Sequence, residues 1–307
     1  MHSRRDFGKV LLAAMPMAAQ GAINSKIGGV QIGVISYSFR SVPSREIIPA
    51  MVKIGLGEVE LMSVDAETLA SDPVVSSGAA ATERLATQES LGQWRAAVKP
   101  EAFRGGHNQF TDAGIDLRIL CYNMGVNIDD TETDYAFRMA QALGVRVISS
   151  SATLAVAKRV APFADKYKIV WAAHGHDNVK DPEQFATPEV FAKVLALGKY
   201  MGVNLDVGHF TAAGFDAVSY IKENHARITN LHLKDQKKSP PGETTAILNN
   251  NYPWGEGDSP IREVLQLLKK EKYDIPANIE YEYAARASGD ATTEVARCFD
   301  YAKKCLA

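Results

Sequence analysis

The chain has little of what marks several large classes of protein. It contains 3 cysteines in 307 residues, none in a C-x-x-C or zinc-finger spacing, which argues against a disulfide scaffold and a zinc module. It has no long basic run, and its formal net charge of −2 at pH 7 gives no support to nucleic-acid binding. No stretch is long and apolar enough to span a membrane. These absences leave a globular protein that handles small molecules as the main class to consider.

The three cysteines, Cys121, Cys298 and Cys305, lie in apolar or amphipathic stretches, and we expect them to be buried core thiols. The first predicted strand–helix turn also lacks a G-x-G-x-x-G sequence, which counts against a dinucleotide-binding sheet. No sequence repeat occurs at the period of a solenoid.

The chain begins MHSRRDFGKVLLAAMPMAAQGA, in which Arg4 and Arg5 precede a short apolar run. This order resembles a twin-arginine export signal, although Gly8 stands where that pattern prefers leucine. The alternative is an ordinary amphipathic helix with two basic residues. We expect residues 1–25 to be a removable signal, residues 26–307 to form the mature domain, and the protein to be periplasmic.

Short apolar strand patterns alternate with helical patterns along the rest of the chain. We predict eight strands, at 30–39, 57–62, 115–123, 145–151, 168–176, 203–210, 228–235 and 277–283. Helical patterns include 89–98, 100–113, 131–144 with Thr131 as cap, 188–201 with Gly202 as stop, 260–272 and 290–305. Residues 63–88 show little periodicity and are expected to be an insertion after the second strand. Eight strand–helix units predict a single-domain α/β protein, a (β/α)₈ TIM barrel, with a doubly wound open sheet as the alternative.

Four consecutive predicted strands end in side chains that bind metals. They are His174 and His176, Asp206 and His209, His232, and Glu280 and Glu282. The carboxyl ends of parallel barrel strands meet at one face, so these groups are expected to lie together. One histidine at a strand end is more often structural than a ligand, but four adjacent ends with His or carboxylate predict a divalent-metal site.

Several motifs resemble those of the xylose isomerase-like TIM barrels, the superfamily of sugar phosphate isomerases/epimerases that also holds endonuclease IV. LDVGH is similar to the family's D-x-x-H, NLHLKD to its H-x-K-D, and PWGEGD to its G-x-G-D loop. IEYE resembles the final metal-binding segment, and VEL at 59–61 resembles the strand-two motif. The resemblance covers roughly residues 30–305.

The resemblance implies one divalent ion (Mn, Zn, Co, Fe or Mg) held by His174, Asp206, His232 and Glu280. His174 stands where many relatives have a glutamate, and either it or His176 is the strand-five ligand. The other implied roles are catalysis by Glu280, His209 and His176, and substrate binding by Glu60, Lys234 and Glu282. For Glu60, a structural ion pair is an equal expectation.

The implied function is a sugar isomerase or epimerase that works through an enediolate on a small sugar or glycoside. A lyase acting on 3-keto-glycosides and a non-catalytic sugar-binding barrel are the alternatives. A nuclease is disfavoured by the near-neutral charge and the expected export. We expect no nucleic-acid partner and no membrane association after signal removal, and a homo-oligomer is one expected state.

Overall fold

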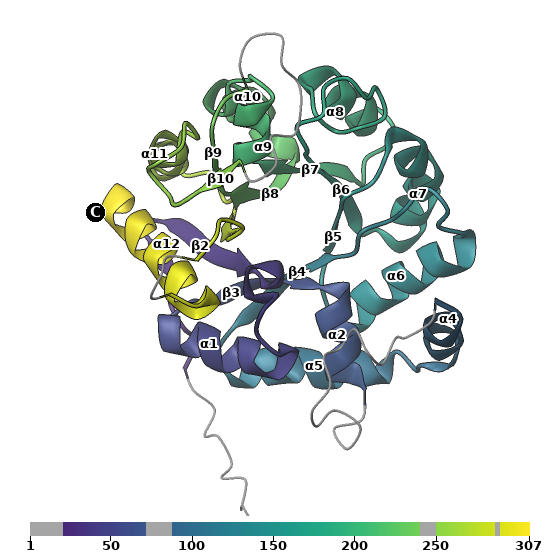
Figure 1. Cartoon of the computed structure of the whole chain (residues 1–307). Coiled ribbons are helices and arrows are strands. Elements are labelled where there is room, and N and C mark those ends of the chain that lie inside the picture. The colour runs from purple at the N-terminus through teal and green to yellow at the C-terminus, as the bar shows by residue number, and fades with distance from the viewer. Residues whose placement is uncertain (1–20, 72–87, 240–249, 286–288) are drawn as a thin grey trace, which may run out of the picture.

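Eight parallel strands form a closed ring in the computed structural model, which describes residues 21–71, 88–239, 250–285 and 289–307 (Figure 1). The strands are β2 (Val30–Ile35), β3 (Glu58–Met62), β4 (Asp116–Cys121), β5 (Val147–Ser150), β6 (Val170–His174), β7 (Met201–Asp206), β8 (Ile228–Leu233) and β11 (Ala277–Ile279). The ring closes because β2 pairs in parallel with both β3 and β11. The predicted (β/α)₈ TIM barrel is therefore confirmed.

Helices surround the strands, as Figure 1 shows. The longer ones are α1 (Ile47–Ile54), α2 (Ser63–Ala70), α4 (Gln88–Ala97), α5 (Glu101–Asp112), α6 (Asp130–Ala142), α7 (Leu154–Tyr167), α8 (Pro188–Leu195), α10 (Ala217–Asn224), α11 (Ile261–Glu271) and α12 (Ala291–Leu306). Their apolar faces pack on the strands in one core, which includes Cys298 and Cys305, and Cys121 is buried in strand β4, so all three free cysteines are buried as predicted. Within the described residues, no helix combines the length and the apolar character that a membrane span needs.

Two helices have other boundaries than those predicted from the sequence. Helix α6 is capped by Asp129, whose carboxylate accepts a hydrogen bond from the Glu132 backbone N–H at 2.7 Å, and not by Thr131. Helix α8 ends at Leu195, and Gly202 belongs to strand β7. A side chain at Gly202 would approach β-branched residues of both neighbouring strands at 2.9 Å, so close packing, and not helix termination, requires glycine there.

All four predicted strands that bear the polar residues end earlier than expected, and the difference is largest in β7 and β11. Strand β7 stops at Asp206, and a short helix, α9 (Val207–Ala212), follows at once. The Asp206 carboxylate caps that helix by accepting a hydrogen bond from the His209 N–H at 2.8 Å. Strand β11 stops at Ile279, so Glu280 lies just beyond the ladder. The polar side chains are thus carried by strand ends and the first turns after them.

A short antiparallel strand precedes the barrel and was not predicted. Strand β1 (Lys26–Ile27) pairs with the start of β2. Just before it, the Ile23 N–H donates to the Gly114 carbonyl at 2.8 Å, and the Ser25 hydroxyl donates to the Ile32 carbonyl at 2.6 Å. Contacts with the barrel therefore begin at Ile23, while residues 1–20 of the expected signal lie outside the described part of the chain.

The expected insertion at 63–88 is ordered at its start. Helix α2 occupies Ser63–Ala70, and residues 72–87 lie outside the described residues. Helix α4 is joined to α2 by Arg95, whose Nε donates to Glu67 Oε1 at 2.7 Å. Glu67 is almost fully buried, so this ion pair fixes α4 against the barrel more firmly than an exposed pair could.

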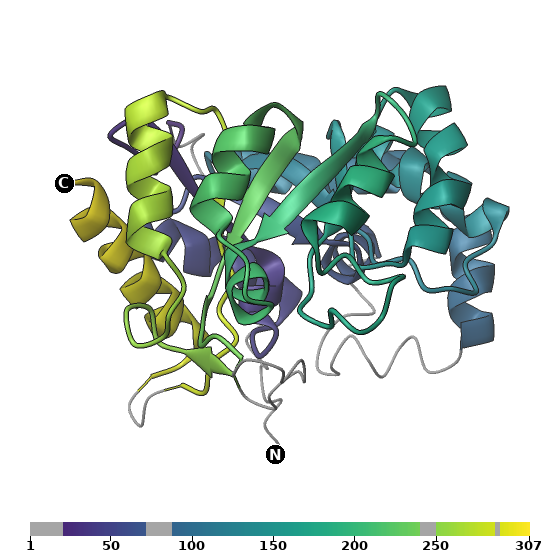
Figure 2. The ribbon, with the colours of Figure 1, turned by 90° about the horizontal axis from the view of Figure 1, so that it is seen from above.

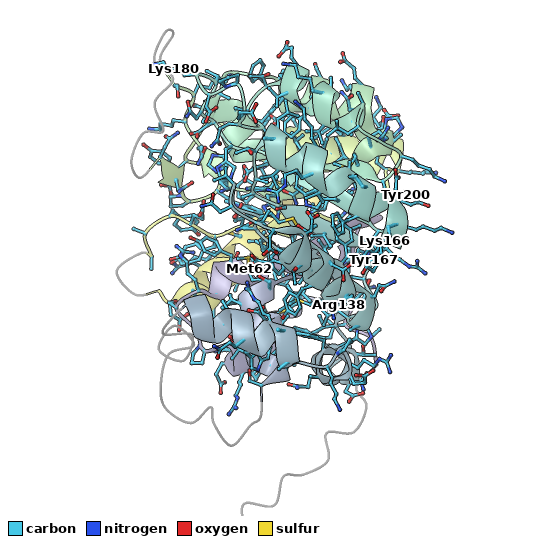
Figure 3. All side chains as sticks on the ribbon, turned by 90° about the vertical axis from the view of Figure 1, so that its right-hand side faces the viewer. Met62, Arg138, Lys166, Tyr167, Lys180 and Tyr200 are labelled. Carbon is cyan, nitrogen blue, oxygen red and sulfur yellow. The ribbon has the colours of Figure 1, made fainter. Side chains whose placement is uncertain are left out.

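Helices α6 and α7 are joined at the surface by one carboxylate. Figure 3 shows Arg138, Lys166 and Tyr167 close together on the outer face of the molecule. The side chains of all three donate to Asp134, at 3.0 Å, 2.7 Å and 2.6 Å respectively. These groups are largely exposed to solvent, so each ion pair contributes little to stability.

A small hairpin follows strand β8 and projects from one side of the barrel (Figure 2). It pairs β9 (Asp235–Gln236) with β10 (Asn251–Tyr252). The Asp235 carboxylate accepts backbone hydrogen bonds from Gly255 at 2.7 Å, Gly257 at 3.0 Å and Ser259 at 3.1 Å. One buried carboxylate therefore anchors the whole segment that leads into α11.

We expect Asp235→Asn to lower the free energy of unfolding by about 1–3 kcal/mol, because an amide nitrogen would face backbone N–H groups that need an acceptor. Urea denaturation followed by circular dichroism measures the change. Asp258→Asn is the matched control, since the carboxylate of this exposed residue accepts a single hydrogen bond within the described residues, from the Lys238 N–H at 3.0 Å. We expect that control to lie within about 0.5 kcal/mol of wild type. Equal losses in both variants would contradict the anchoring role.

Candidate metal centre

The ends of four adjacent strands bring His174, Asp206, His232 and Glu280 together. One possible ligand atom from each lies within 4.8 Å of the others, and all four residues are buried. His174 ends β6, Asp206 ends β7, His232 lies in β8 and Glu280 follows β11. These strands are neighbours in the ring, so the barrel itself creates the cluster.

His232 is held from below by a carboxylate. Its Nε2 lies 2.7 Å from Glu60 Oε2, which leaves Nδ1 facing Glu280 Oε2 at 3.1 Å. Burial lowers the pKa of His232, but the charges of Glu60 and Glu280 outweigh burial and raise the pKa well above its usual value. A histidine whose far nitrogen is bonded to a carboxylate has a fixed ring orientation and a more basic free nitrogen, as metal-ligating histidines do.

His174 is oriented in a different way. Its Nδ1 lies 2.6 Å from Asn204 Oδ1, an acceptor, so Nδ1 carries the proton and Nε2 keeps its lone pair. Burial, with the neighbouring positive charge of His232, holds the pKa of His174 well below its usual value. The ring is therefore neutral, which is the form that binds a metal ion.

Three atoms of the cluster are buried and make no hydrogen bond of good geometry within the described part of the chain: Asp206 Oδ2, His232 Nδ1 and Glu280 Oε2. Their near neighbours are one another and a single ammonium group, that of Lys234, which leaves lone pairs and negative charge in a buried site. Two oxygens and one nitrogen, with the free nitrogen of His174, form a donor set that suits a divalent ion of borderline or hard character. The residues therefore fit a metal ion.

Lys234 lies inside the cluster and is almost fully buried. Its Nζ is 3.2 Å from Asp206 Oδ2, 3.0 Å from Glu280 Oε2 and 2.5 Å from Glu282 Oε2. Burial lowers the pKa of Lys234, but the three carboxylates outweigh burial and raise it well above its usual value. The ammonium group therefore balances part of the negative charge of the site. Glu282 is the most exposed of these carboxylates, which leaves it the most accessible to a bound molecule.

A second group of side chains borders the cluster. His209 Nε2 lies 3.1 Å from Lys234 Nζ, and its Nδ1 lies 3.8 Å from Asp177 Oδ2. The ring of His176 stacks on that of His209 with 5.2 Å between centroids, and its Nε2 lies 3.1 Å from Ser151 Oγ. Asp177 and Ser151 were not identified from the sequence, although Asp177 directly follows the H-G-H segment.

The surroundings of His176 favour its neutral form. Burial first, and then the charges of His209 and Lys234, lower the pKa of His176 to about 4. The catalytic roles expected for His176 and His209 stay predictions.

Glu60 lies beneath the cluster and is fully buried. Its carboxylate accepts hydrogen bonds from Asn230 Nδ2 at 2.7 Å, Asn278 Nδ2 at 3.2 Å and the Ser149 hydroxyl, besides that of His232. Both oxygens are used within the protein. The geometry therefore matches the structural ion pair that we considered for Glu60, and not the substrate contact.

A family model described as xylose isomerase-like TIM barrel matches residues 74–302 of the chain. A search of curated proteins found no match.

Several solved structures have the same fold. The probable 3-DHS dehydratase AsbF from Bacillus anthracis is 13% identical with a TM-score of 0.60, over 88% of this chain and 97% of that one. The IOLI protein, solved with a bound zinc atom, is 16% identical with a TM-score of 0.62, over 90% and 96%. A sugar phosphate isomerase/epimerase from Parabacteroides distasonis is 14% identical with a TM-score of 0.57, over 94% and 99%.

Proposed function

The chain belongs to the xylose isomerase-like TIM barrel family, and from that premise we propose that it is a metal-dependent enzyme that forms an enediolate on a small carbohydrate. The observation that carries the proposal is the buried cluster of four possible ligand atoms at adjacent strand ends, all within 4.8 Å of one another. The ammonium group of Lys234 balances only part of the charge of its carboxylates, and a divalent cation would balance the rest.

His174, Asp206, His232 and Glu280 would hold the ion. When bound, a divalent ion supplies a Lewis acid that polarises a carbonyl oxygen and stabilises negative charge on it. The zinc atom of the IOLI protein makes zinc the first ion to test, ahead of Mn, Co, Fe and Mg.

The remaining chemistry falls to the side chains around the ion. Glu280 is a carboxylate at the centre of the cluster and is the candidate for moving the proton of a carbon next to a carbonyl. Lys234 holds the carboxylates of Asp206, Glu280 and Glu282 in place through its ammonium group. His209 is the candidate proton donor toward a substrate oxygen.

The carboxylates best placed for proton transfer, Glu280 and its alternative Glu282, come from a single strand end, because strand β6 ends in His174, Asp206 caps α9 and Glu60 is enclosed below. Inversion at carbon is favoured by two opposed bases, whereas isomerisation on one face needs one base. The same single base also suits β-elimination, in which an acid protonates the departing oxygen. A lyase acting on 3-keto-glycosides is therefore the second candidate, and it is supported by the likeness in fold to a protein described as a probable 3-DHS dehydratase.

Incubation of the purified protein in D₂O with a panel of aldoses, ketoses and 3-keto-glycosides tests the proposal. We expect uptake of deuterium at the carbon next to the carbonyl, and we expect a chelator to stop it. Release of the aglycone distinguishes elimination from isomerisation. Absence of exchange across the panel, with metal bound, would instead favour a non-catalytic sugar-binding barrel.

We also propose export by the twin-arginine route, on the residues at the start of the chain alone. Folded export would let the protein acquire its metal before it leaves the cytoplasm. Replacing Arg4 and Arg5 by lysine is expected to leave the precursor in the cytoplasm, as cell fractionation and immunoblotting would show. Replacing Lys9 by arginine in the same segment is the control, and it should leave export intact. An unchanged periplasmic yield of the double-lysine variant would contradict the proposal.

A further inference from the structure

A second glutamate lies deeper in the barrel than the candidate metal centre. Glu58 begins β3, two residues before Glu60, and its side chain is buried. Neither of its carboxylate oxygens has a hydrogen-bond partner within the described residues. The metal chemistry does not use this residue, so its burial needs a separate explanation.

The space that Glu58 occupies is provided by a glycine. A Cβ atom built on Gly33 of β2 would lie 1.6 Å from Glu58 Oε2 and 3.0 Å from Asn278 Oδ1. The two oxygens are therefore neighbours in the space above Gly33. Asn278 Oδ1 is also buried without a partner in the described part of the chain. A side chain at Gly33 would displace both groups.

The Asn278 amide has its orientation set by its other end. Its Nδ2 donates to Glu60 Oε2 at 3.2 Å, so Oδ1 is the atom turned toward Glu58. An ionised Glu58 has only acceptor atoms, and it would face the acceptor Oδ1 with no donor between them. A protonated Glu58 supplies the missing donor and gives partners to two unpartnered groups at once.

The charges around Glu58 favour the proton. Burial raises its pKa most strongly, Arg118 lowers it, Glu60 and Asp116 raise it, and the Asn278 side chain lowers it, with a net pKa of about 8. Arg118 gives little relief, because it is partly exposed and lies 3.4 Å from the Asp116 carboxylate. The geometry and the electrostatics thus agree on a neutral carboxylic acid at neutral pH.

We propose that Glu58 is a positioning residue that stays protonated and donates to Asn278, which fixes the amide that supports Glu60 and, through Glu60, the metal-facing ring of His232. The chain of contacts runs from Asn278 Nδ2 to Glu60 Oε2 at 3.2 Å and from Glu60 Oε2 to His232 Nε2 at 2.7 Å. Its link to metal binding rests on the proposed function, whereas the protonation of Glu58 does not.

Two substitutions separate this role from simple space filling. Glu58→Gln keeps the shape and supplies a neutral donor, so zinc affinity should stay within about twofold of wild type. Glu58→Leu keeps the bulk but has no donor, so Asn278 is free to turn. Loss of a group that contacts and orients a metal ligand lowers metal affinity by about 10–100-fold. Glu58 acts on His232 only through Asn278 and Glu60, so for Glu58→Leu we expect a smaller loss of about 3–10-fold.

Isothermal titration with zinc at pH 7 measures these affinities, with competition by a chelator where binding is tight. Glu294→Leu is the matched control, because it removes another fully buried glutamate, on α12, that bonds to Tyr283. It should lose stability without a change in zinc affinity. Wild-type affinity in Glu58→Leu would overturn the proposal, and so would an affinity in Glu58→Gln as weak as that in Glu58→Leu.

The second measurement needs no metal. Wild-type Glu58 is neutral when folded and ionises at its ordinary pKa when unfolded, so the wild type should lose stability relative to Glu58→Gln as pH rises from about 4.5 to about 8. Above and below that range the difference should not change with pH. Urea midpoints of the two chelator-treated proteins measure it.

A flat difference across that range would show that Glu58 is ionised and would overturn the proposal, even if Glu58→Leu does not fold. If the wild type binds no divalent ion, the proposed function fails. In that case the pH difference still decides the state of Glu58.

Discussion

Asp206→Asn is expected to weaken divalent-metal binding about 100-fold while leaving the barrel folded. The carboxylate has two separate tasks: Oδ1 caps α9 through the His209 N–H, and Oδ2 faces the cluster, 3.2 Å from Lys234 Nζ. Asparagine caps a helix as well as aspartate does, so the fold should keep α9 in place. It offers no second anionic oxygen, so the ion loses a charged ligand.

The expected loss of metal affinity can be estimated from the number of ligands. Structural zinc sites contribute about 10–16 kcal/mol, which shared among four ligands is about 3 kcal/mol each, or about 100-fold in affinity. His232→Ala should show a loss of the same order, since it removes a neutral nitrogen ligand. Zinc titration and elemental analysis of the purified variants measure both effects.

His176→Ala is the matched control for the two ligand variants. This histidine lies at the same face of the barrel, but its Nε2 is directed to Ser151 and it is not part of the four-residue cluster. The control should therefore keep its metal. Full metal content in both Asp206→Asn and His232→Ala would show that the ligands lie elsewhere.

The sequence was sufficient to predict the barrel fold and to identify the residues at the strand ends that lie together in the cluster. Apolar strand patterns identify buried parallel strands, and a closed parallel barrel brings all their carboxyl ends to one face. The residues that end β6, β7 and β8 therefore had to meet, whatever the details of packing. No knowledge of the partners of each side chain was needed for that step.

The polar residues one layer below the metal cluster were not identified from the sequence, although their positions follow a pattern. Asn204, Asn230 and Asn278 each stand two residues before a member of the cluster, so they point into the barrel one layer lower. A search for polar residues at that spacing would have found them. The side chains that they contact depend on the register between neighbouring strands around the barrel, which the sequence does not show.

Glu60 illustrates the difficulty. It meets Asn230, which is 170 residues away in the sequence, across the inside of the barrel. The register of β3 against β4 shifts between Val59 and Glu60, so counting residues along the two strands gives the wrong neighbours. This is why the sequence left a substrate contact and an internal ion pair as equal alternatives for Glu60.

Glu280→Gln is expected to remove deuterium exchange into a keto-sugar. Glutamine keeps the size of the side chain but cannot accept the carbon-bound proton, and loss of a positioned base reduces such reactions by about 10²–10⁴-fold. Because Glu280 also belongs to the metal cluster, the rates must be compared at saturating metal, with occupancy confirmed by elemental analysis.

Glu282→Gln separates the role of the base from the general charge of the site. Both glutamates lie within 3.0 Å of Lys234 Nζ, so either substitution removes one negative charge from the same ammonium group. Only Glu280 belongs to the metal cluster, so Glu282→Gln should weaken substrate binding and keep exchange at saturating substrate. If exchange survives in metal-loaded Glu280→Gln and is lost in Glu282→Gln, the base is Glu282, and proton transfer takes place at the more exposed of the two carboxylates.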